Sequence, residues 1–354
     1  KRPPWDCTII EGLDHHRFAL YLKMHHSLID GVSGMRMLLG AMSHDREKSV
    51  GLPPWWGAET AQPSRHPHAP TMAGVIDAVV QGVRDEAKSL PSLAAAFGKM
   101  AARIGDPREG LVVPFDSPRS VLNGRVRPKR RFATQQFALS RLRRLADVAN
   151  CKINDVVLAI CGGALRRFLY EQEALPEKSL TAGIPVSVRP KDDLRIGNAI
   201  SFIVSTLGTD IADPAERLKA VKASVGFAKA HVQSLPRQAM TQYTILLMAP
   251  TIVSLLTGIG GRTRPMFNIT VSNVPGPEKP LYFQGAELLA AFPVSIVSHG
   301  QALNITCHSY SGNINFGFTG CHTSVPSLQR LAVYSAEALK ELEDAVLPHP
   351  HALV

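Results

Sequence analysis

The stretch FALYLKMHHSLIDG at residues 18–31 decides how this chain is interpreted. From Phe18 onward, apolar residues occupy every second position, and His26 continues the same register. A period of two is typical of a β-strand and places alternate side chains on one face. The alternation therefore predicts a strand whose apolar face also carries His26, while His25 lies on the opposite face.

The heptapeptide that ends this stretch, HHSLIDG at residues 25–31, has the composition of a catalytic turn. An imidazole can take the hydroxyl proton of an alcohol as it attacks a thioester, and can return that proton to the leaving thiolate. Its ordinary pKa lies near the working pH, which suits both steps. We interpret His26 as the general base. We expect His25 to shape the loop, Asp30 to orient a neighbouring Arg or backbone amide, and Gly31 to permit a tight turn.

The alternative interpretation of His26 is a core histidine with a satisfied hydrogen bond. Strand placement, inward direction, the spacing to Asp30 and the following Gly31 coincide here, which favours the functional interpretation. The earlier pair His15-His16 lacks an Asp-Gly sequence behind it. We therefore predict a plain turn at His15-His16, between strands in the region 8–26.

Beyond Gly31 the sequence predicts an apolar helix, a Pro- and Trp-rich loop over 44–70 and a helical region over 71–104. Residues 105–131 contain Pro, Gly and the basic cluster Arg125–Arg131, and we predict a linker there. The expected domains are 1–104, the remainder of a first half, and 132–354, a second half.

The second half alternates predicted strands and helices. We expect strands at 132–139 and near 181–188, 199–207, 267–272, 287–297, 302–310 and 313–318, and helices at 141–150, up to Tyr170, from Pro214, at 238–259 and at 324–345. Ser140, Asn154 or Asp155, and Asp213 are the expected helix N-caps. Interleaved strands and helices of this kind indicate an α/β fold class with mixed sheets.

Several segments together resemble one known family. His25-His26-x-x-x-Asp30-Gly31 is similar to the H-H-x-x-x-D-G motif of the chloramphenicol acetyltransferase-like superfamily. Other segments resemble its bacterial wax ester synthase/diacylglycerol acyltransferase branch: RPPW at 2–5, NDVVLA at 154–159, Gly197-Asn198, SNVPGP at 272–277 and the stretch 280–295. The resemblance covers nearly the whole chain. The family's first element is usually P-L-W, and Pro4 replaces the Leu here.

The resemblance implies two acetyltransferase-like halves around a tunnel, which acyl-CoA enters from one side and the alcohol or diacylglycerol from the other. It implies that His26 is the catalytic base and that Asp30 is mainly structural. No metal or redox cofactor is expected, and acyl-CoA is a substrate. In the family the motif sits well inside the first half, so its position at residue 25 leads us to expect a missing N-terminal segment that remains a partner of this chain.

Four further residues are candidates for contact with substrate. Asn273 and Ser272 end a predicted strand, where a side-chain donor near the thioester oxygen would stabilise an oxyanion; the alternative is a strand stop formed by turn residues. Asn154 and Asp155 either cap a helix or position substrate beside the tunnel. Cys161 is interpreted as a packed thiol, because its context is a helix interior.

Composition excludes several other classes. The net charge is +10, from 39 Lys and Arg against 29 Asp and Glu, but no nucleic-acid-binding module is recognisable, so no nucleic-acid partner is expected. The five cysteines are odd in number and lack a C-x-x-C spacing, which argues against a disulfide framework or a structural zinc site. They suit a reducing compartment, so we expect a cytoplasmic protein.

The apolar run Tyr243–Ile259 is interrupted by Pro250 and predicts a buried or interfacial helix rather than a spanning one. We expect peripheral contact with a membrane or lipid droplet, with Arg125–Arg131 available for CoA phosphates or lipid headgroups or simply solvated. Three rivals stay open at this point: a carrier-protein-dependent condensation domain, a dihydrolipoyl acyltransferase core and a catalytically silent lipid-binding scaffold. The histidine motif of a dihydrolipoyl acyltransferase lies near its C-terminus, which disfavours that rival.

Overall fold

The computed structural model describes residues 5–25, 31–54, 112, 116–187, 200–234 and 237–348. The chain forms two compact units. The first comprises Lys1–Ser64, Val188–Ile200 and Pro280–Leu289, and the second comprises Arg65–Ser187, Ser201–Lys279 and Ala290–Val354. The helical region predicted over 71–104 and the Gly197-Asn198 pair lie outside the described residues.

The first unit contains the predicted hairpin. Strand β1 (Trp5–Leu13) pairs antiparallel with β2 (Arg17–Met24), with Trp5 opposite Met24. His15 and His16 have φ of 60° and 55° and form the connecting turn, which confirms the turn predicted for this pair. Helix α1 (Gly31–Leu39) and a short 3-10 helix, η1 (Glu47–Ser49), follow.

A short segment from late in the sequence completes the first unit. Strands β7 (Tyr282–Phe283) and β8 (Ala286–Glu287) form a two-stranded ribbon, and Tyr282 pairs with Ser43. The Gln284 carboxamide accepts a hydrogen bond from Gly51 N (3.0 Å) and donates one to Leu52 O (2.9 Å). We call residues 280–289 the strap, because their contacts belong to the first unit although they follow most of the second along the chain.

The second unit is built on a six-stranded mixed sheet in the order β3-β10-β9-β6-β4-β5. The strands are β3 (Arg130–Ala138), β4 (Thr181–Ser187), β5 (Ile200–Thr206), β6 (Ile269–Val274), β9 (Leu303–Tyr310) and β10 (Asn313–Cys321). β10 pairs antiparallel with β3 and β9, whereas β6 pairs parallel with β9 and β4. The predicted α/β class with a mixed sheet is confirmed.

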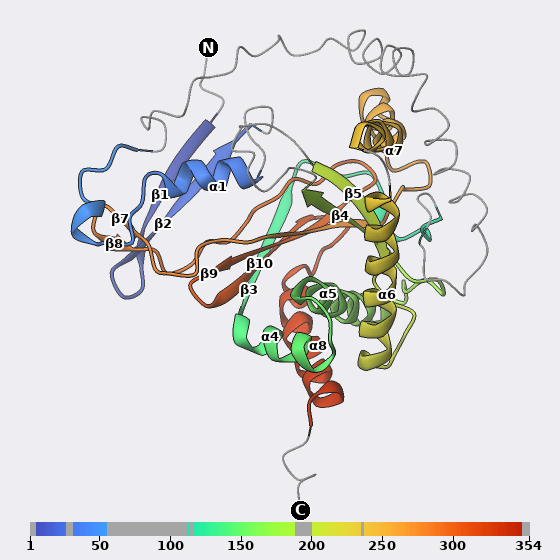
Figure 1. The fold of residues 1–354 in the computed structure, drawn as a ribbon. Helices are drawn as coiled ribbons and strands as arrows, with labels where there is room; N and C mark the ends of the chain where they lie inside the picture. The colour runs from blue at the N-terminus through green and yellow to red at the C-terminus, as the bar shows by residue number, and fades with distance from the viewer. Residues whose placement is uncertain are drawn as a thin grey trace, which may run out of the picture. The chain divides into compact units, whose positions relative to one another are not determined.

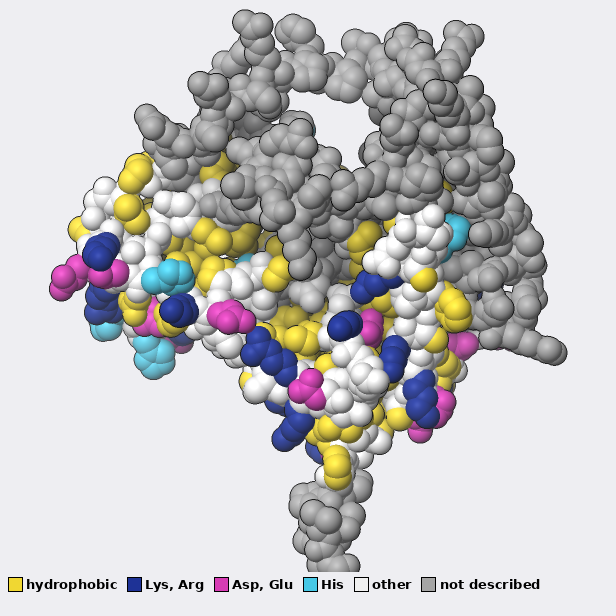
Figure 2. Space-filling model, in the orientation of Figure 1, with side chains coloured by type: hydrophobic (Ala, Val, Ile, Leu, Met, Phe, Trp, Pro, Cys, Tyr) yellow, Lys and Arg dark blue, Asp and Glu magenta, His cyan; other side chains and the backbone are white. Residues whose placement is uncertain are grey.

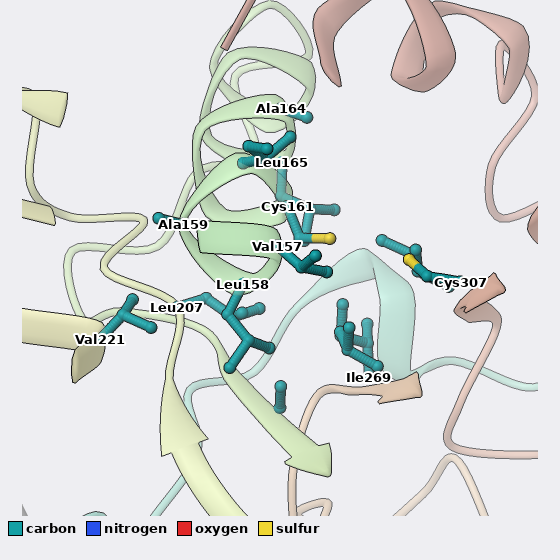
Figure 3. Close-up of a cluster of buried hydrophobic side chains, with 14 of the residues drawn as sticks. Val157, Leu158, Ala159, Cys161, Ala164, Leu165, Leu207, Val221, Ile269 and Cys307 are labelled. Atoms are coloured by element: carbon teal, nitrogen blue, oxygen red, sulfur yellow. The ribbon is translucent and has the colours of Figure 1, made fainter. Parts of the chain in front are cut away.

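Helices α4 (Leu139–Val148), α5 (Ile153–Tyr170), α6 (Pro214–Gln233) and α8 (Gln329–Val346) gather on one side of this sheet (Figure 1). Helix α5 is central among them and packs against α4, α6 and α8. Its Val157, Leu158 and Cys161 meet Ile269 of β6 and Cys307 of β9 in a buried apolar cluster (Figure 3). Burial of apolar side chains such as these is the dominant favourable term in folding.

Three sequence expectations about local structure are wrong. Ser140 does not cap a helix, because α4 begins one residue earlier and its N-cap, Ala138, has no side-chain cap. Neither Asn154 nor Asp155 is the N-cap of α5, since the helix begins at Ile153 after Lys152. Of the strand expected near 287–297, only Glu287 is in a strand, as the last residue of β8. Residues 288–297 belong to no strand. The Asp213-Pro214 start is confirmed, with Asp213 accepting from Glu216 N (2.8 Å).

The described part of the predicted linker, residues 116–131, is integrated into the second unit. The Ser117 hydroxyl lies 2.6 Å from the Thr181 hydroxyl, and both side chains are buried. The Asn123 amide, in the short 3-10 helix η3 (Val121–Asn123), donates to the backbone oxygens of Asn268 and Gly300. These bonds fix residues 116–124 against the sheet.

The apolar run around Pro250 forms α7 (Arg237–Thr257). In the part of the chain that the structure describes, no single helix is long and apolar enough to cross a membrane; α4 and α5 pass the length and composition test only as a pair bent by 102°. Most of the α5 side chains lie in the core of the second unit.

Candidate active site

The H-H-x-x-x-D-G motif lies between β2 and α1 of the first unit. Alternation is confirmed over Leu20–Met24, where Leu20, Leu22 and Met24 are half-buried while Tyr21 and Lys23 are exposed. It is wrong at the start of β2, where Phe18 is exposed and Ala19 is half-buried. His25 directly follows the strand and is exposed, and Gly31 begins α1. His26 and Asp30 lie outside the described residues, so the inward direction of His26 and the role of Asp30 stay predictions.

Ser272 and Asn273 lie near the end of β6, and their side chains point to opposite faces of the sheet. In the parallel pairing of β6 with β9, Ser272 is opposite Thr306 and Asn273 is opposite Cys307. Neighbouring side chains of a strand point to opposite faces. Asn273 therefore shares the face of Cys307, which meets α5, and Ser272 shares the other face with Thr306. An oxyanion bound on one face of the sheet can accept a hydrogen bond from only one of these two side chains. Ser272 and Asn273 are therefore alternative donors to the oxyanion.

The face that carries Ser272 is polar. The Thr306 hydroxyl lies 2.7 Å from the Ser295 hydroxyl and donates to Asn304 Oδ1 at 2.8 Å. Ser295 N also donates to the Thr319 hydroxyl of β10. Neither Ser272 nor Asn273 makes a side-chain hydrogen bond to any residue that the structure describes, so both have donors and acceptors available for a substrate.

The face that carries Asn273 holds thiols that are poor nucleophiles. Burial raises the pKa of Cys161 to about 12 and raises that of Cys307 well above its ordinary value. A buried protonated thiol packs as a small apolar group. The prediction that Cys161 is a packing residue is confirmed, and all five cysteines are free of disulfides.

His308 is a buried residue beside the SNVPGP segment that the sequence did not single out. Its Nδ1 lies 3.1 Å from Val274 O, and burial lowers its pKa, which favours the neutral ring, with a smaller opposing effect from this hydrogen bond. A Cβ on Gly276 would lie 2.3 Å from His308 Cε1 and 2.3 Å from Ser309 O. The ring thus packs directly on the Gly276 backbone, which explains the need for glycine there.

Further hydrogen bonds hold the same turn. Gly276 N donates to the Ser309 hydroxyl (3.1 Å), and Ser311 N donates to Pro277 O (2.9 Å). His308 lies in the strand predicted at 302–310, on the face of Thr306 and out of phase with Leu303, Ile305 and Cys307, so the apolar alternation of the strand gave no signal for its burial.

At the start of α5, Asp155 is buried and Asn154 is half-buried. Asp155 Oδ2 accepts from Lys152 N (2.9 Å), so the carboxylate satisfies a backbone group of the first helical turn from the N3 position. Asp155 Oδ1 is also buried and has no hydrogen-bond partner in the described part of the chain. Asp155 therefore does accept a hydrogen bond from a backbone N–H at the start of the helix, as the capping alternative expected, but from the N3 position and not from the N-cap.

Comparisons with known proteins agree over both parts of the chain. Residues 1–157 match the model of the wax ester synthase/diacylglycerol acyltransferase catalytic domain, and residues 196–343 match that of the WS/DGAT C-terminal domain. A putative diacylglycerol O-acyltransferase of Mycobacterium tuberculosis is 43% identical over 98% of this chain and 75% of its own length. The O-acyltransferase WSD of Acinetobacter baylyi is 37% identical over 98% of this chain and 74% of its own length.

A solved structure is similar over the same span. The wax ester synthase/diacylglycerol acyltransferase from Marinobacter aquaeolei superposes with a TM-score of 0.74 at 35% identity, covering 98% of this chain and 73% of the other. The agreement extends over both units, so the similarity concerns the whole chain and not a single shared motif.

Proposed function

We propose a reaction for this chain from the premise that it belongs to the wax ester synthase/diacylglycerol acyltransferase family and is an acyltransferase. It transfers a fatty acyl group from acyl-CoA to the hydroxyl of a long-chain alcohol, giving a wax ester, and to that of diacylglycerol, giving triacylglycerol. The observation that carries this proposal is the intact H-H-x-x-x-D-G motif, set between the end of β2 and the start of α1 in a chain that matches both family domains.

In the proposed mechanism His26 accepts the hydroxyl proton while the alcohol oxygen attacks the thioester carbonyl. The carbon–sulfur bond breaks when the tetrahedral intermediate collapses, and the CoA thiolate takes the proton back from the imidazolium. The reaction balances without a metal or redox cofactor. Ser272 or Asn273 supplies a hydrogen bond to the oxyanion, which typically lowers the barrier by about 3–4 kcal/mol.

The proposed roles of the other motif residues are positional. His25 follows β2 directly, so its exposed side chain shapes the loop. Asp30 and Gly31 hold the turn that leads into α1. Asn154 and Asp155 keep their proposed role beside the substrate; Asp155 Oδ1 is buried and has no hydrogen-bond partner among the described residues.

The proposal is tested by the choice of donor and acceptor. The chain is incubated with palmitoyl-CoA and hexadecanol, released thiol is followed continuously, and the ester is identified by chromatography. Parallel reactions replace hexadecanol with dipalmitoylglycerol, or palmitoyl-CoA with a palmitoylated carrier protein. Ester from the CoA donor supports the proposal. Ester from the carrier-protein donor alone would establish a condensation-type enzyme, and no ester from either donor would favour a silent lipid-binding scaffold.

A further inference from the structure

The two faces of the six-stranded sheet carry different side chains. One face packs on the helical layer, whose outer surface shows Lys and Arg interspersed with Asp and Glu (Figure 2). The other face holds polar residues on the neighbouring strands β6, β9 and β10. Strand register places there Thr270, Ser272, Thr306, His308, Asn315 and Thr319. Part of this polar face lies beside the SNVPGP turn, where the candidate oxyanion donors are.

A row of four residues crosses this face, one from each of four strands. Gln136 of β3 is opposite Asn315 of β10. Asn315 is in turn opposite His308 of β9, and His308 is opposite Val274 of β6. Directly opposite residues of an antiparallel pair have Cβ atoms about 4.5–5.5 Å apart, so their side chains interact. The row therefore connects the edge strand β3 with the last residue of β6.

Hydrogen bonds along the row orient its two buried side chains. Gln136 Nε2 donates to Asn315 Oδ1 (2.8 Å), which fixes the Asn315 amide. His308 Nδ1 lies 3.1 Å from Val274 O, so the neutral ring carries its proton on Nδ1 and leaves Nε2 as an acceptor. Asn315 Nδ2 is a buried donor without a partner in the described part of the chain, and His308 Nε2 forms no hydrogen bond there. A matching donor and acceptor thus belong to directly opposite residues.

The His308 ring also holds the backbone that follows the candidate oxyanion donors. Its partner Val274 O is the carbonyl next after Asn273. A Cβ on Gly276 would lie 2.7 Å from His308 Nε2, so the ring packs closely on the turn as well. Since the ring contacts the chain on both sides of Pro275, a movement of the ring would displace the end of β6.

We propose that His308, supported by Asn315, is a positioning residue for acyl transfer: the neutral ring holds the end of β6 so that Ser272 or Asn273 reaches the oxyanion. Neither His308 nor Asn315 is assigned a contact with the reacting atoms. The inference rests on the proposed function, because it takes the oxyanion donor from Ser272 and Asn273. A displacement of about 1 Å in a reacting geometry can cost about 100-fold in rate.

Protonation of His308 would disturb this arrangement. An imidazolium carries a donor on both nitrogens, so its Nε2–H would be set beside the donor of the Asn315 amide. Burial lowers the pKa of His308 from its ordinary value of 6.5, with a smaller opposing effect from the bond to Val274 O. The ring is therefore neutral above pH 6.5 and gains its proton as pH falls below that value.

Few charged groups lie near the ring in the described part of the chain. Strands β6 and β10, on either side of β9, contain no acidic or basic side chain. On β9 itself the next titratable residue of the same face is Tyr310. After the turn comes Glu278, which is exposed and paired with Arg143 at 3.4 Å. None of these groups offsets the burial of an imidazolium at His308.

The test is the pH dependence of kcat for ester formation from palmitoyl-CoA and hexadecanol in two variants of one residue. His308→Leu removes the donor to Val274 O, so kcat should fall about 100-fold at every pH while the KM for hexadecanol changes little. His308→Asn places an amide N–H where the ring has Nδ1–H and does not titrate. Its kcat at neutral and alkaline pH should stay close to that of the parent.

The acid side of the pH profile separates positioning from a merely structural role. In the parent, protonation of His26 and of His308 both lower kcat, so log kcat should fall about twice as steeply at low pH as in His308→Asn. Asn315→Asp sets a carboxylate beside the ring and favours the imidazolium. It should move the loss of activity caused by His308 about 1–3 pH units higher.

The matched control is His322→Leu, which removes a half-buried ring from the end of the same sheet, where its Nε2 lies 3.1 Å from Arg131 Nη2. It should keep the parental kcat and pH profile. Hydrogen exchange over residues 270–279 adds a readout that needs no catalysis. Relative to the intrinsic rate, exchange should quicken in the parent below pH 6.5 and should not do so in His308→Asn.

These readouts fail separately. If the parent makes no ester, the proposed function is wrong, and hydrogen exchange still decides whether His308 holds the turn. Parental kcat in His308→Leu would overturn the positioning role, as would exchange over 270–279 that is the same in parent and both variants. A His308→Asn variant as slow as His308→Leu would also overturn it, because the donor to Val274 O is retained. An unshifted profile in Asn315→Asp would remove Asn315 from the proposal.

Discussion

In the second unit Phe316 and Phe318 are fully buried, whereas in the first unit the hairpin leaves Phe18 44% and Ile9 60% exposed. Among the described residues the first unit fully buries only Ala41, Ser49 and Leu281, and the hydrogen bonds of the strap connect its segments instead. The unit that carries the histidine motif thus has little apolar burial of its own in the described residues. We therefore expect substitutions in the core of the second unit to change the free energy of unfolding, and substitutions in the histidine motif of the first unit to change the rate of acyl transfer.

The largest expected effect contrasts one phenylalanine from each unit. Phe316 is fully buried. Its ring packs edge-on to that of Phe137, with 5.4 Å between the ring centroids, and stacks on that of Phe318, with 6.1 Å between the centroids. Phe316→Ala should lower the free energy of unfolding of the second unit by about 3–5 kcal/mol. Phe18→Ala should cost under about 1 kcal/mol by the same denaturant titration, because its ring already contacts water. Equal costs would remove the contrast between the units.

Gly276→Ala should destabilise the SNVPGP turn by about 1–3 kcal/mol, because the new methyl group meets the His308 ring and Ser309 O. The matched control is Gly226→Ala in α6, where a Cβ meets nothing within 4 Å. There the higher helix propensity of alanine should stabilise by about 0.5–1 kcal/mol. Thermal unfolding of both variants checks the opposite signs, and a neutral Gly276→Ala would show that the turn yields freely.

A pH effect is expected from Cys321 at the end of β10. Burial raises the pKa of its thiol, but hydrogen bonds from the Thr323 hydroxyl and the N–H groups of Arg127, Ser324 and Thr323 outweigh burial and lower it to about 6. This pKa lies below the unfolded value of 9.0, so the stabilisation is complete above pH 9 and is lost as pH falls to 6.

Stability of the second unit should therefore rise between pH 6 and 9 by at most about 1.4 kcal/mol per pH unit from this group. Cys321→Ser should abolish that contribution. Burial raises the pKa of Cys161 to about 12, and the unfolded thiol begins to ionise only as pH approaches 9.0, so Cys161→Ala should leave the slope unchanged over the lower part of this range. An unchanged slope in Cys321→Ser would mean that the thiol is not ionised in the folded protein.

The smallest expected effect concerns the strap. Gln284→Ala removes the hydrogen bonds to Gly51 N and Leu52 O, which are exposed to solvent, and should cost about 1 kcal/mol. Hydrogen exchange of amides in the first unit measures this loss locally, and amides of the β3–β10 ladder serve as the internal reference. Faster exchange throughout both units would contradict the idea that the strap stabilises only the first.

Much of the fold could be predicted because its signals are local. Alternation along Phe18–Met24 predicted β2, and the Asp213-Pro214 pair predicted the start of α6. The extension of the 287–297 strand was wrong because Phe292, Val294 and Ile296 alternate with inward residues without any backbone ladder. A period of two reports alternating burial and does not reveal whether a partner strand exists.

The candidate site was harder to predict, because pairings distant in sequence place its parts. Adjacent residues of a strand point to opposite faces, but only the pairing of β6 with β9 shows that Ser272 shares its face with Thr306 and Asn273 shares its face with Cys307. The packing of His308 on Gly276 depends on the same pairing, and the strap brings residues 280–289 to the first unit. None of these juxtapositions has a short-range sequence signal.

The most direct test of the separation between chemistry and stability is one pair of measurements on His26→Ala, with His25→Ala as the matched variant. The rate of ester formation from palmitoyl-CoA and hexadecanol should fall by about 100- to 10,000-fold in His26→Ala, as expected for loss of a general base. Its denaturation midpoint should equal that of the parent, and His25→Ala should lose less activity. Ester formation by His26→Ala at the parental rate would contradict the account. A denaturation midpoint of His26→Ala well below that of the parent would also contradict it.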